Sequence, residues 1–104
     1  MNEESDLKKL FREWQIDKYN FMTPKIDLLL EKGDIIVEIS SGTPFIGLAI
    51  RGVTIYRHVD EGIFESLDLD LDKGFCDKDW KKVEADALNY AKEIMLQLPR
   101  MRGG

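Results

Sequence analysis

The spacing of hydrophobic residues indicates a helix at each end of the chain. Near the N-terminus, apolar residues recur every three or four positions, the period of one helix face: Leu7, Leu10, Phe11 and Trp14. Ser5 precedes this stripe and can cap a helix, while Asp6 suits the positive N-terminal end. The pattern predicts a helix from Asp6 to about Tyr19.

The same period returns near the C-terminus and continues for five turns. The stripe consists of Trp80, Val83, Ala87, Leu88, Ala91, Ile94, Met95 and Leu98. Asp77 or Asp79 can cap this helix, and Pro99 is expected to end it. Residues 99–104 are expected to form a flexible tail.

The segment after the first helix is compatible with two structures. Thr23 can cap a short helix, with Pro24 in its first turn and Gly33 at its end. Alternatively, Ile26 to Leu30 form a strand that turns through residues 31–34 into Ile35. We favour the short helix.

Alternation of apolar and polar residues predicts strands in the middle of the chain. A first strand begins at Ile35 and continues through Val37 and Ile39. The next two strands, 45–50 and 53–59, flank a two-residue turn at Arg51-Gly52. A turn at residues 60–62 leads into a fourth strand, 63 to about 71. The pattern predicts a mostly antiparallel four-stranded meander and, with the helices, an α+β fold whose long C-terminal helix packs on the sheet.

This register collects the apolar residues of the meander on one sheet face. It places Ile50 opposite Val53, Val59 opposite Ile63, and Arg57 opposite Glu65. The two charges on that face therefore oppose each other, which stabilises a sheet. The apolar members of the face are Ile46, Leu48, Ile50, Val53, Ile55, Val59, Ile63, Leu67, Leu69 and Leu71.

Length and composition are those of one globular domain. The chain has 104 residues, of which 43% are hydrophobic and 34% charged. Its one cysteine, Cys76, cannot form an intrachain disulfide, which fits a reducing compartment. The chain starts without a signal-peptide pattern, and no apolar run reaches the ~20 residues that span a bilayer. We expect a cytoplasmic protein.

The net charge of −5 is concentrated in one segment. Residues 60–79 contain eight acidic residues and two lysines, so this segment alone carries −6. Such an acidic segment repels phosphates and attracts basic surfaces. We expect another protein with a basic surface as the partner, and neither nucleic acid nor a membrane; the oligomeric state stays open.

The acidic stretch Ser66 to Asp72 has three interpretations. Asp68, Asp70, Asp72 and Asp79 match positions of a calcium loop, but Lys73 stands where that loop needs glycine. In the second interpretation, leucine and aspartate alternate along a solvated strand. In the third, the same strand holds Asp68, Asp70 and Asp72 roughly 6–7 Å apart, like backbone phosphates, as partner-binding residues.

The other sheet face is expected to carry an aromatic cluster. Its members are Phe45, Tyr56, His58 and Phe64. If both helices pack on the aliphatic face, these rings are exposed and form a partner site. If one helix covers each face, the rings belong to the core.

No residue pattern indicates catalysis. His58 is the only histidine, and an enzyme centred on it would need Arg57 or Glu61 to assist. The register puts Arg57 on the opposite face, and no nucleophile or cofactor motif is present. We therefore expect a non-enzymatic binding protein without metal or cofactor, of the acidic inhibitor or immunity type, that mimics phosphates and docks on a basic nucleic-acid enzyme.

Overall fold

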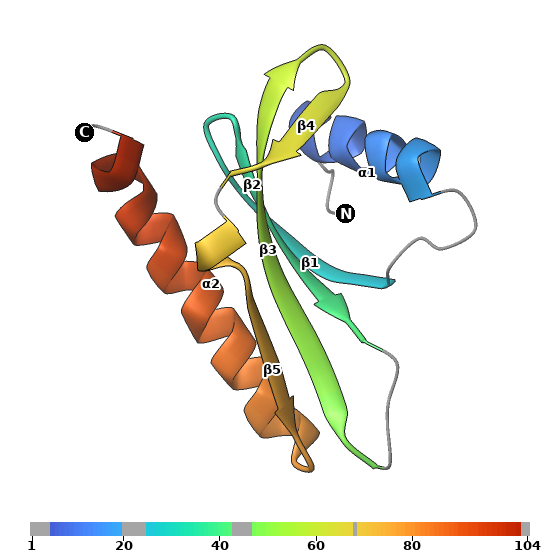
Figure 1. Cartoon of the computed structure of the whole chain (residues 1–104), viewed down its shortest axis with the longest axis vertical. Coiled ribbons are helices and arrows are strands. Elements are labelled where there is room, and N and C mark those ends of the chain that lie inside the picture. The colour runs from blue at the N-terminus through green and yellow to red at the C-terminus, as the bar shows by residue number, and fades with distance from the viewer. Residues whose placement is uncertain (1–4, 20–24, 43–46, 68, 103–104) are drawn as a thin grey trace.

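The computed structural model describes residues 5–19, 25–42, 47–67 and 69–102 and has the expected α+β architecture (Figure 1). Its elements are helix α1 (Asp6–Tyr19), strands β1 (Lys25–Lys32), β2 (Ile35–Ser41), β3 (Ala49–Asp60) and β4 (Ile63–Ser66), the 3-10 helix η2 (Leu69–Leu71), strand β5 (Lys73–Asp77) and helix α2 (Trp80–Arg102). Neither α-helix is long and apolar enough to cross a membrane over the residues described.

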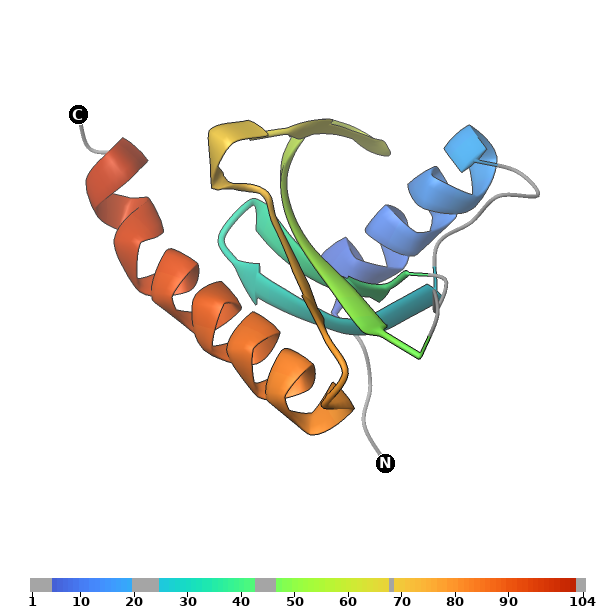
Figure 2. The ribbon, with the colours of Figure 1, turned by 60° about the horizontal axis from the view of Figure 1, so that its bottom comes forward.

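The sheet is antiparallel, with the strand order β1-β2-β3-β4. Strand β5 also pairs with β3, along the half of β3 that β4 does not reach. The two α-helices cover opposite faces of the sheet (Figure 2). The antiparallel meander and the long C-terminal helix on the sheet are thus confirmed.

Helix α1 has the predicted bounds and the predicted cap. Ser5 Oγ accepts a hydrogen bond of 3.2 Å from the backbone N–H of Lys8. The helix buries Phe11 in a cluster with four residues of the sheet, Leu29, Ile36, Tyr56 and Phe64. Its stripe therefore supplies one of the two cores of the molecule.

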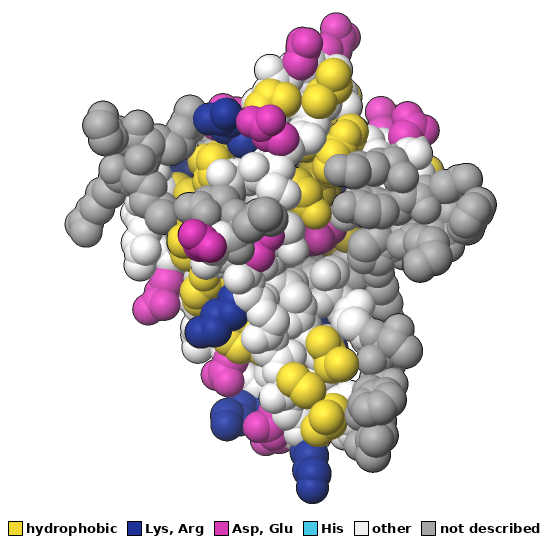
Figure 3. All heavy atoms as spheres, viewed as in Figure 1, with side chains coloured by type: hydrophobic (Ala, Val, Ile, Leu, Met, Phe, Trp, Pro, Cys, Tyr) yellow, Lys and Arg dark blue, Asp and Glu magenta, His cyan; other side chains and the backbone are white. Residues whose placement is uncertain are grey.

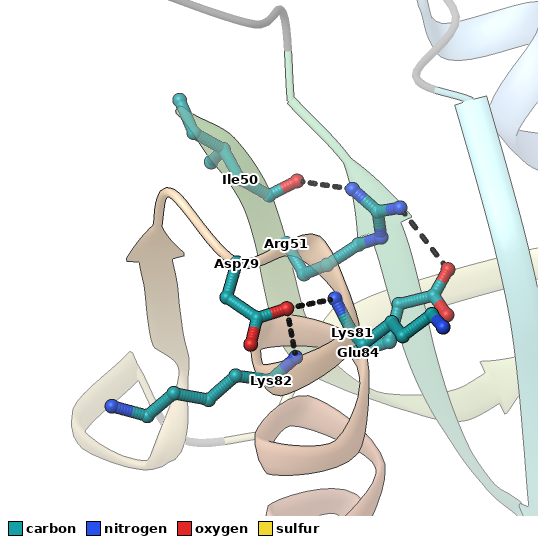
Figure 4. A network of polar contacts seen from close by, with 6 residues as sticks. All are labelled: Ile50, Arg51, Asp79, Lys81, Lys82 and Glu84. Carbon is teal, nitrogen blue, oxygen red and sulfur yellow. Dashed lines mark hydrogen bonds and ion pairs between the residues drawn. The ribbon is translucent and has the colours of Figure 1, made fainter. Parts of the chain in front are cut away.

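Helix α2 supplies the other, aliphatic core. The carboxylate of Asp79 caps it by accepting bonds from the backbone N–H groups of Lys81 and Lys82, at 3.1 and 3.4 Å (Figure 4). Five residues of the predicted stripe are buried: Val83, Ala87, Ala91, Ile94 and Leu98. Trp80, the first residue of the helix, is by contrast 53% exposed.

The prediction that Pro99 ends the second helix is wrong, because α2 continues to Arg102. A proline inside a helix has no N–H for the carbonyl four residues before it, here that of Met95. Lys32 Nζ donates to this carbonyl at 2.8 Å. The lysine of β1 thus replaces the donor that the helix lacks, and flexibility of residues 99–104 stays a prediction.

Residues 25–32 form strand β1, so the favoured short helix is wrong. The strand joins β2 through a two-residue turn, Gly33-Asp34, in which Gly33 adopts a φ of 61°. Glycine reaches this left-handed region without strain, which favours a tight hairpin. Leu28 and Leu30 then lie on the α2 face and Leu29 on the α1 face.

The predicted hairpin at Arg51-Gly52 is also wrong. Strand β3 runs through both residues, and Gly52 pairs with Ser40 on one side and Gly74 on the other. In a continuous strand, Ile50 and Val53 point to opposite faces, whereas the hairpin would have put them on the same face. Leu48 precedes this strand, and Ile46 lies outside the described residues.

The second predicted hairpin exists, with a shifted tip. Arg57 pairs with Glu65, as expected, and their side chains form an ion pair at 3.1 Å. A bulge at Val59 makes Asp60, rather than Val59, the partner of Ile63. The turn therefore consists of residues 61–62.

Candidate partner-binding surface

The alternating acidic stretch is not a strand. Strand β4 ends at Ser66, and η2 occupies Leu69–Leu71 before β5 begins. A 3-10 helix turns every three residues, so alternate positions no longer share one face. The expected row of three carboxylates along a strand is therefore wrong, and Asp68 lies outside the described residues.

Asp72 has a structural task that the sequence pattern did not show. On this edge of β3, pairing with β4 extends to Tyr56 and pairing with β5 extends to Val53. Between these two residues β3 has no strand partner on this edge among the described residues. In this gap, the backbone N–H of Ile55 donates to Asp72 Oδ1 at 3.1 Å, and Ile55 accepts from the N–H of Leu67 at 2.9 Å. Asp72 thus completes the edge of the sheet, whereas Asp70 is exposed.

A hydrogen bond from α2 holds η2 in place. The hydroxyl of Tyr90 donates to the backbone carbonyl of Leu71. The Tyr90 ring also packs against Phe75 of β5, with centroids 5.7 Å apart, and Lys73 Nζ lies 5.2 Å from the Tyr90 centroid. Burial raises the pKa of the Tyr90 hydroxyl, which favours the neutral form that donates.

The aromatic cluster is covered by α1. Tyr56 is 7% and Phe64 3% exposed, and the Phe11 ring of α1 lies 5.0 and 5.2 Å from their centroids. The alternative with one helix on each face is the one observed, so Tyr56 and Phe64 do not form an exposed partner site. Phe45 lies outside the described residues.

His58 packs against the aromatic cluster. Its ring stacks on Phe64 at 4.9 Å, and its Nε2 is buried without a hydrogen-bond partner among the described residues. Arg57 points to the opposite sheet face, as predicted from the alternation.

The calcium alternative does not fit the structure. Strand β5 occupies Lys73–Asp77, in the middle of the segment that would have to curl around the ion. Within the described residues, no cluster of three or more His, Cys, Asp or Glu side chains could hold a metal ion. Cys76 is exposed.

Two grooves beside α2 are apolar and poor in polar groups. The smaller has a volume of about 170 Å³ and is lined by Leu28, Ile39, Arg51, Glu84 and Leu88. Arg51 and Glu84 form an ion pair at 3.3 Å on its wall (Figure 4). The other, about 400 Å³, is lined by Leu30, Lys92, Met95 and Leu96. Both grooves, formed by residues that the structure describes, are open to solvent rather than enclosed.

The β3–β4 hairpin projects from the sheet and carries exposed apolar and acidic side chains at its end. Arg57 pairs with the first residue of β2, and the N–H of His58 donates to the Asp34 carbonyl at 2.8 Å; past His58, the strand pairs that are described lie within the hairpin. We call Val59, Asp60, Glu61 and Ile63 the hairpin tip. Val59 and Ile63 are 43% and 50% exposed, and both acids are exposed as well. Figure 3 shows apolar and acidic side chains together at the top of the view.

The backbone of the tip is held in shape by its own residues. Asp60 Oδ1 accepts a bond of 2.7 Å from the N–H of Glu61, and Gly62 has a φ of 68°. Sequence reasoning placed Val59 and Ile63 in the core. It could not show that β3 extends beyond β2, because this depends on pairing between distant residues. The contiguous acidic pair was the only signal in the sequence that pointed to this surface.

Comparison of the chain with protein-family models, with curated proteins and with solved structures found no match. The chemistry of the hairpin tip is therefore the guide to function. Apolar side chains beside carboxylates on a projecting, preformed turn suit contact with a surface that is apolar at its centre and basic at its rim.

Proposed function

We propose that the protein is a non-enzymatic binding module of the cytoplasm, which docks through its hairpin tip on a basic surface of another protein. The observation that carries this proposal is the exposure of Val59 and Ile63 directly beside Asp60 and Glu61. Large apolar side chains exposed together mark interaction surfaces. Adjacent carboxylates select partners with Lys and Arg around the contact.

The tip alone is too small for a stable complex, since each partner in a specific interface buries about 800 Å². Two more acids beyond the tip are exposed: Glu65 on β4, which is paired with Arg57, and Asp70 on η2. These charges belong to the segment that carries −6. They would form an acidic rim that speeds association with a basic partner.

The sharper form of the proposal is an inhibitor or immunity-type protein that blocks a nucleic-acid enzyme. Such enzymes bind phosphates in basic grooves, and a projecting acidic hairpin has a shape that can enter a groove. Support for this form comes from the hairpin rather than from a row of carboxylates at strand spacing.

Three variants test the tip. Asp60→Asn/Glu61→Gln removes its charge, and Val59→Ser/Ile63→Ser removes its apolar contact. Glu13→Gln/Asp86→Asn changes the net charge by the same amount at exposed sites on the helices and serves as the matched control. Proteins captured from cytoplasmic extract by the unaltered chain are identified by mass spectrometry, and the dissociation constant of the purified partner is measured by calorimetry.

Both tip variants should weaken binding at least about tenfold, equivalent to about 1.4 kcal/mol, while the control keeps its affinity. The charge variant should also flatten the salt dependence of the association rate. Equal affinity of all variants would contradict the proposal. Competition by a short DNA duplex tests the sharper form separately, because a partner that the duplex does not displace is not held through a phosphate-binding groove.

A further inference from the structure

A buried polar pair lies in the otherwise apolar interface between α1 and the sheet. Gln15 of α1 is 0% and Glu38 of β2 is 2% exposed. They are the two buried polar or charged residues within the part of the chain that is described. The surrounding cluster consists of Phe11, Leu29, Ile36, Tyr56 and Phe64, with Trp14 packed against it. A carboxyl group in such surroundings needs a partner for each of its polar atoms.

The hydrogen bonds of this pair are incomplete if Glu38 is ionised. Gln15 Nε2 donates a hydrogen bond to Glu38 Oε2. Gln15 Oε1 is equally buried, yet it accepts no hydrogen bond from any described residue. A carboxylate has no proton to offer it, whereas a carboxylic acid has one. Protonation of Glu38 would supply the kind of donor that Gln15 Oε1 lacks.

Neighbouring charges act on Glu38 in both directions. Burial raises its pKa, and the negative charge of Asp72, beside β5, adds to this effect. The bond from Gln15 and the positive charge of Arg12, both on α1, act to lower it. On the flanking strands, Leu29 and Thr54 stand opposite Glu38 and carry no charge. The resulting pKa lies above the ordinary value, which favours the protonated form.

We propose that Glu38 is protonated and donates a hydrogen bond to Gln15 Oε1. The neutral pair then acts as a latch that holds α1 on the sheet, and α1 is released when Glu38 loses its proton at rising pH. This latch lies apart from the hairpin tip and does not depend on the proposed binding function. When the latch opens, α1 leaves the aromatic cluster while α2 stays on the other face.

The sign of the effect follows from proton linkage. Docked Glu38 holds a proton that an undocked, hydrated Glu38 releases, so rising pH favours the undocked state. The effect begins near the ordinary glutamate pKa of about 4.3 and ends at the raised pKa of the docked state. Within this window, the equilibrium constant for undocking rises by up to about tenfold per pH unit.

Hydrogen exchange of the full-length chain tests the latch. Protection factors of the amides of α1 and α2 are measured from pH 5 to pH 9, each corrected for the intrinsic exchange rate at that pH. Glu38→Gln keeps the shape and removes the proton equilibrium, while Glu31→Gln removes an exposed carboxyl from β1 as the matched control. In the unaltered and control proteins, α1 protection should fall up to tenfold per pH unit, with α2 protection constant.

In Glu38→Gln, the protection of α1 should not change with pH. The same pH dependence in Glu38→Gln and the control, or a parallel fall in α2, would overturn the latch. A second measurement needs no variant: the ¹³C shift of the Glu38 carboxyl in the unaltered protein reports its protonation directly. A titration midpoint above the ordinary glutamate range supports the latch, and a midpoint within that range refutes it.

Discussion

The two faces of the sheet are covered in different ways. Helix α2 has 23 residues and packs through aliphatic side chains, with Ala87 and Ala91 allowing close approach. Its polar links lie at the edges of the interface, such as Lys32 to the Met95 carbonyl and Arg51 to Glu84. Helix α1 has 14 residues and packs through aromatic rings, and its polar link is buried in the interface.

This difference separates a permanent contact from a conditional one. Burial of aliphatic surface stabilises by the same amount at any pH, because no group titrates. A buried carboxyl stabilises its interface only in the protonation state for which partners exist. We therefore expect α2 and the sheet to form the stable unit of the fold, and α1 to dock on it with an affinity that depends on pH.

The largest expected effect is that of Phe11→Ala. Phe11 is fully buried and contacts the rings of Trp14, Tyr56 and Phe64. Its truncation should destabilise the docking of α1 on the sheet by about 3–5 kcal/mol. In a Trp80→Phe background, Trp14 is the sole tryptophan, and its fluorescence should report release of α1 in urea before far-UV circular dichroism reports loss of the sheet.

Ile94→Ala on the other face is the matched comparison, since Ile94 is 3% exposed. It should cost about 2–5 kcal/mol and lower both transitions together, because α2 belongs to the stable unit. If Phe11→Ala also shifts both probes in parallel, the two faces do not differ in the way argued above.

Gln15→Met should have the next largest effect. It removes the donor to Glu38 and leaves a buried carboxyl without a partner, at a cost of about 1–3 kcal/mol. The stability of this variant should be lower at pH 8 than at pH 5, because the raised Glu38 pKa makes the docked state bind an extra proton, so its stability falls as pH rises. Urea midpoints at the two pH values measure this.

The double variant Gln15→Met/Glu38→Met checks the cause of that loss. Replacing both members of a buried polar pair by apolar residues of similar volume is often neutral or stabilising. The double variant should therefore recover stability and lose the pH dependence. A double variant that is as unstable as Gln15→Met would show that the loss comes from packing.

Local sequence signals predicted the helices correctly. They failed where the structure depends on pairing between strands that are distant in the sequence. Ser5 with its stripe and Asp79 with its stripe define both helix starts, because caps and periodicity act within a few residues. Arg51-Gly52 has turn chemistry, yet β3 continues through it. Pairing with Ser40 and Gly74 on both sides overrides the turn, and the sequence does not reveal that pairing.

The candidate surface shows the same limit. The alternation of leucine and aspartate favoured a strand, but Asp72 is needed where β4 and β5 leave a gap beside Ile55. Val59 and Ile63 have the pattern of core residues, but β2 begins opposite Arg57, so the hairpin extends past it and both side chains are exposed. The cross-strand pair Arg57 and Glu65 was predicted correctly, because it depends on one short hairpin.

Asp79→Ala should destabilise the α2 unit by about 1 kcal/mol. Asp79 Oδ1 accepts the bonds of two backbone N–H groups at the start of α2, and alanine leaves both donors to water. The urea midpoint measures the loss, and Asp79→Asn, which also caps helices well, is the control. The loss should appear in the amides of α2 and β3 alike, since α2 and the sheet are expected to unfold together. Loss of protection in α2 alone would contradict their cooperation.

The smallest expected effect is that of the ion pair between Arg57 and Glu65. It lies on the α2 face of the sheet, but its side chains are 39% and 55% exposed, so water and salt screen the attraction. A double-mutant cycle with Arg57→Gln and Glu65→Gln should give about 0.2–1 kcal/mol at low salt and less at high salt. Comparison of this cycle with Gln15→Met tests the effect of burial. We expect a polar pair to contribute strongly to stability where it is buried and little where it is exposed. A coupling as large as that of Gln15 and Glu38 would mean that polar pairs contribute equally on both faces.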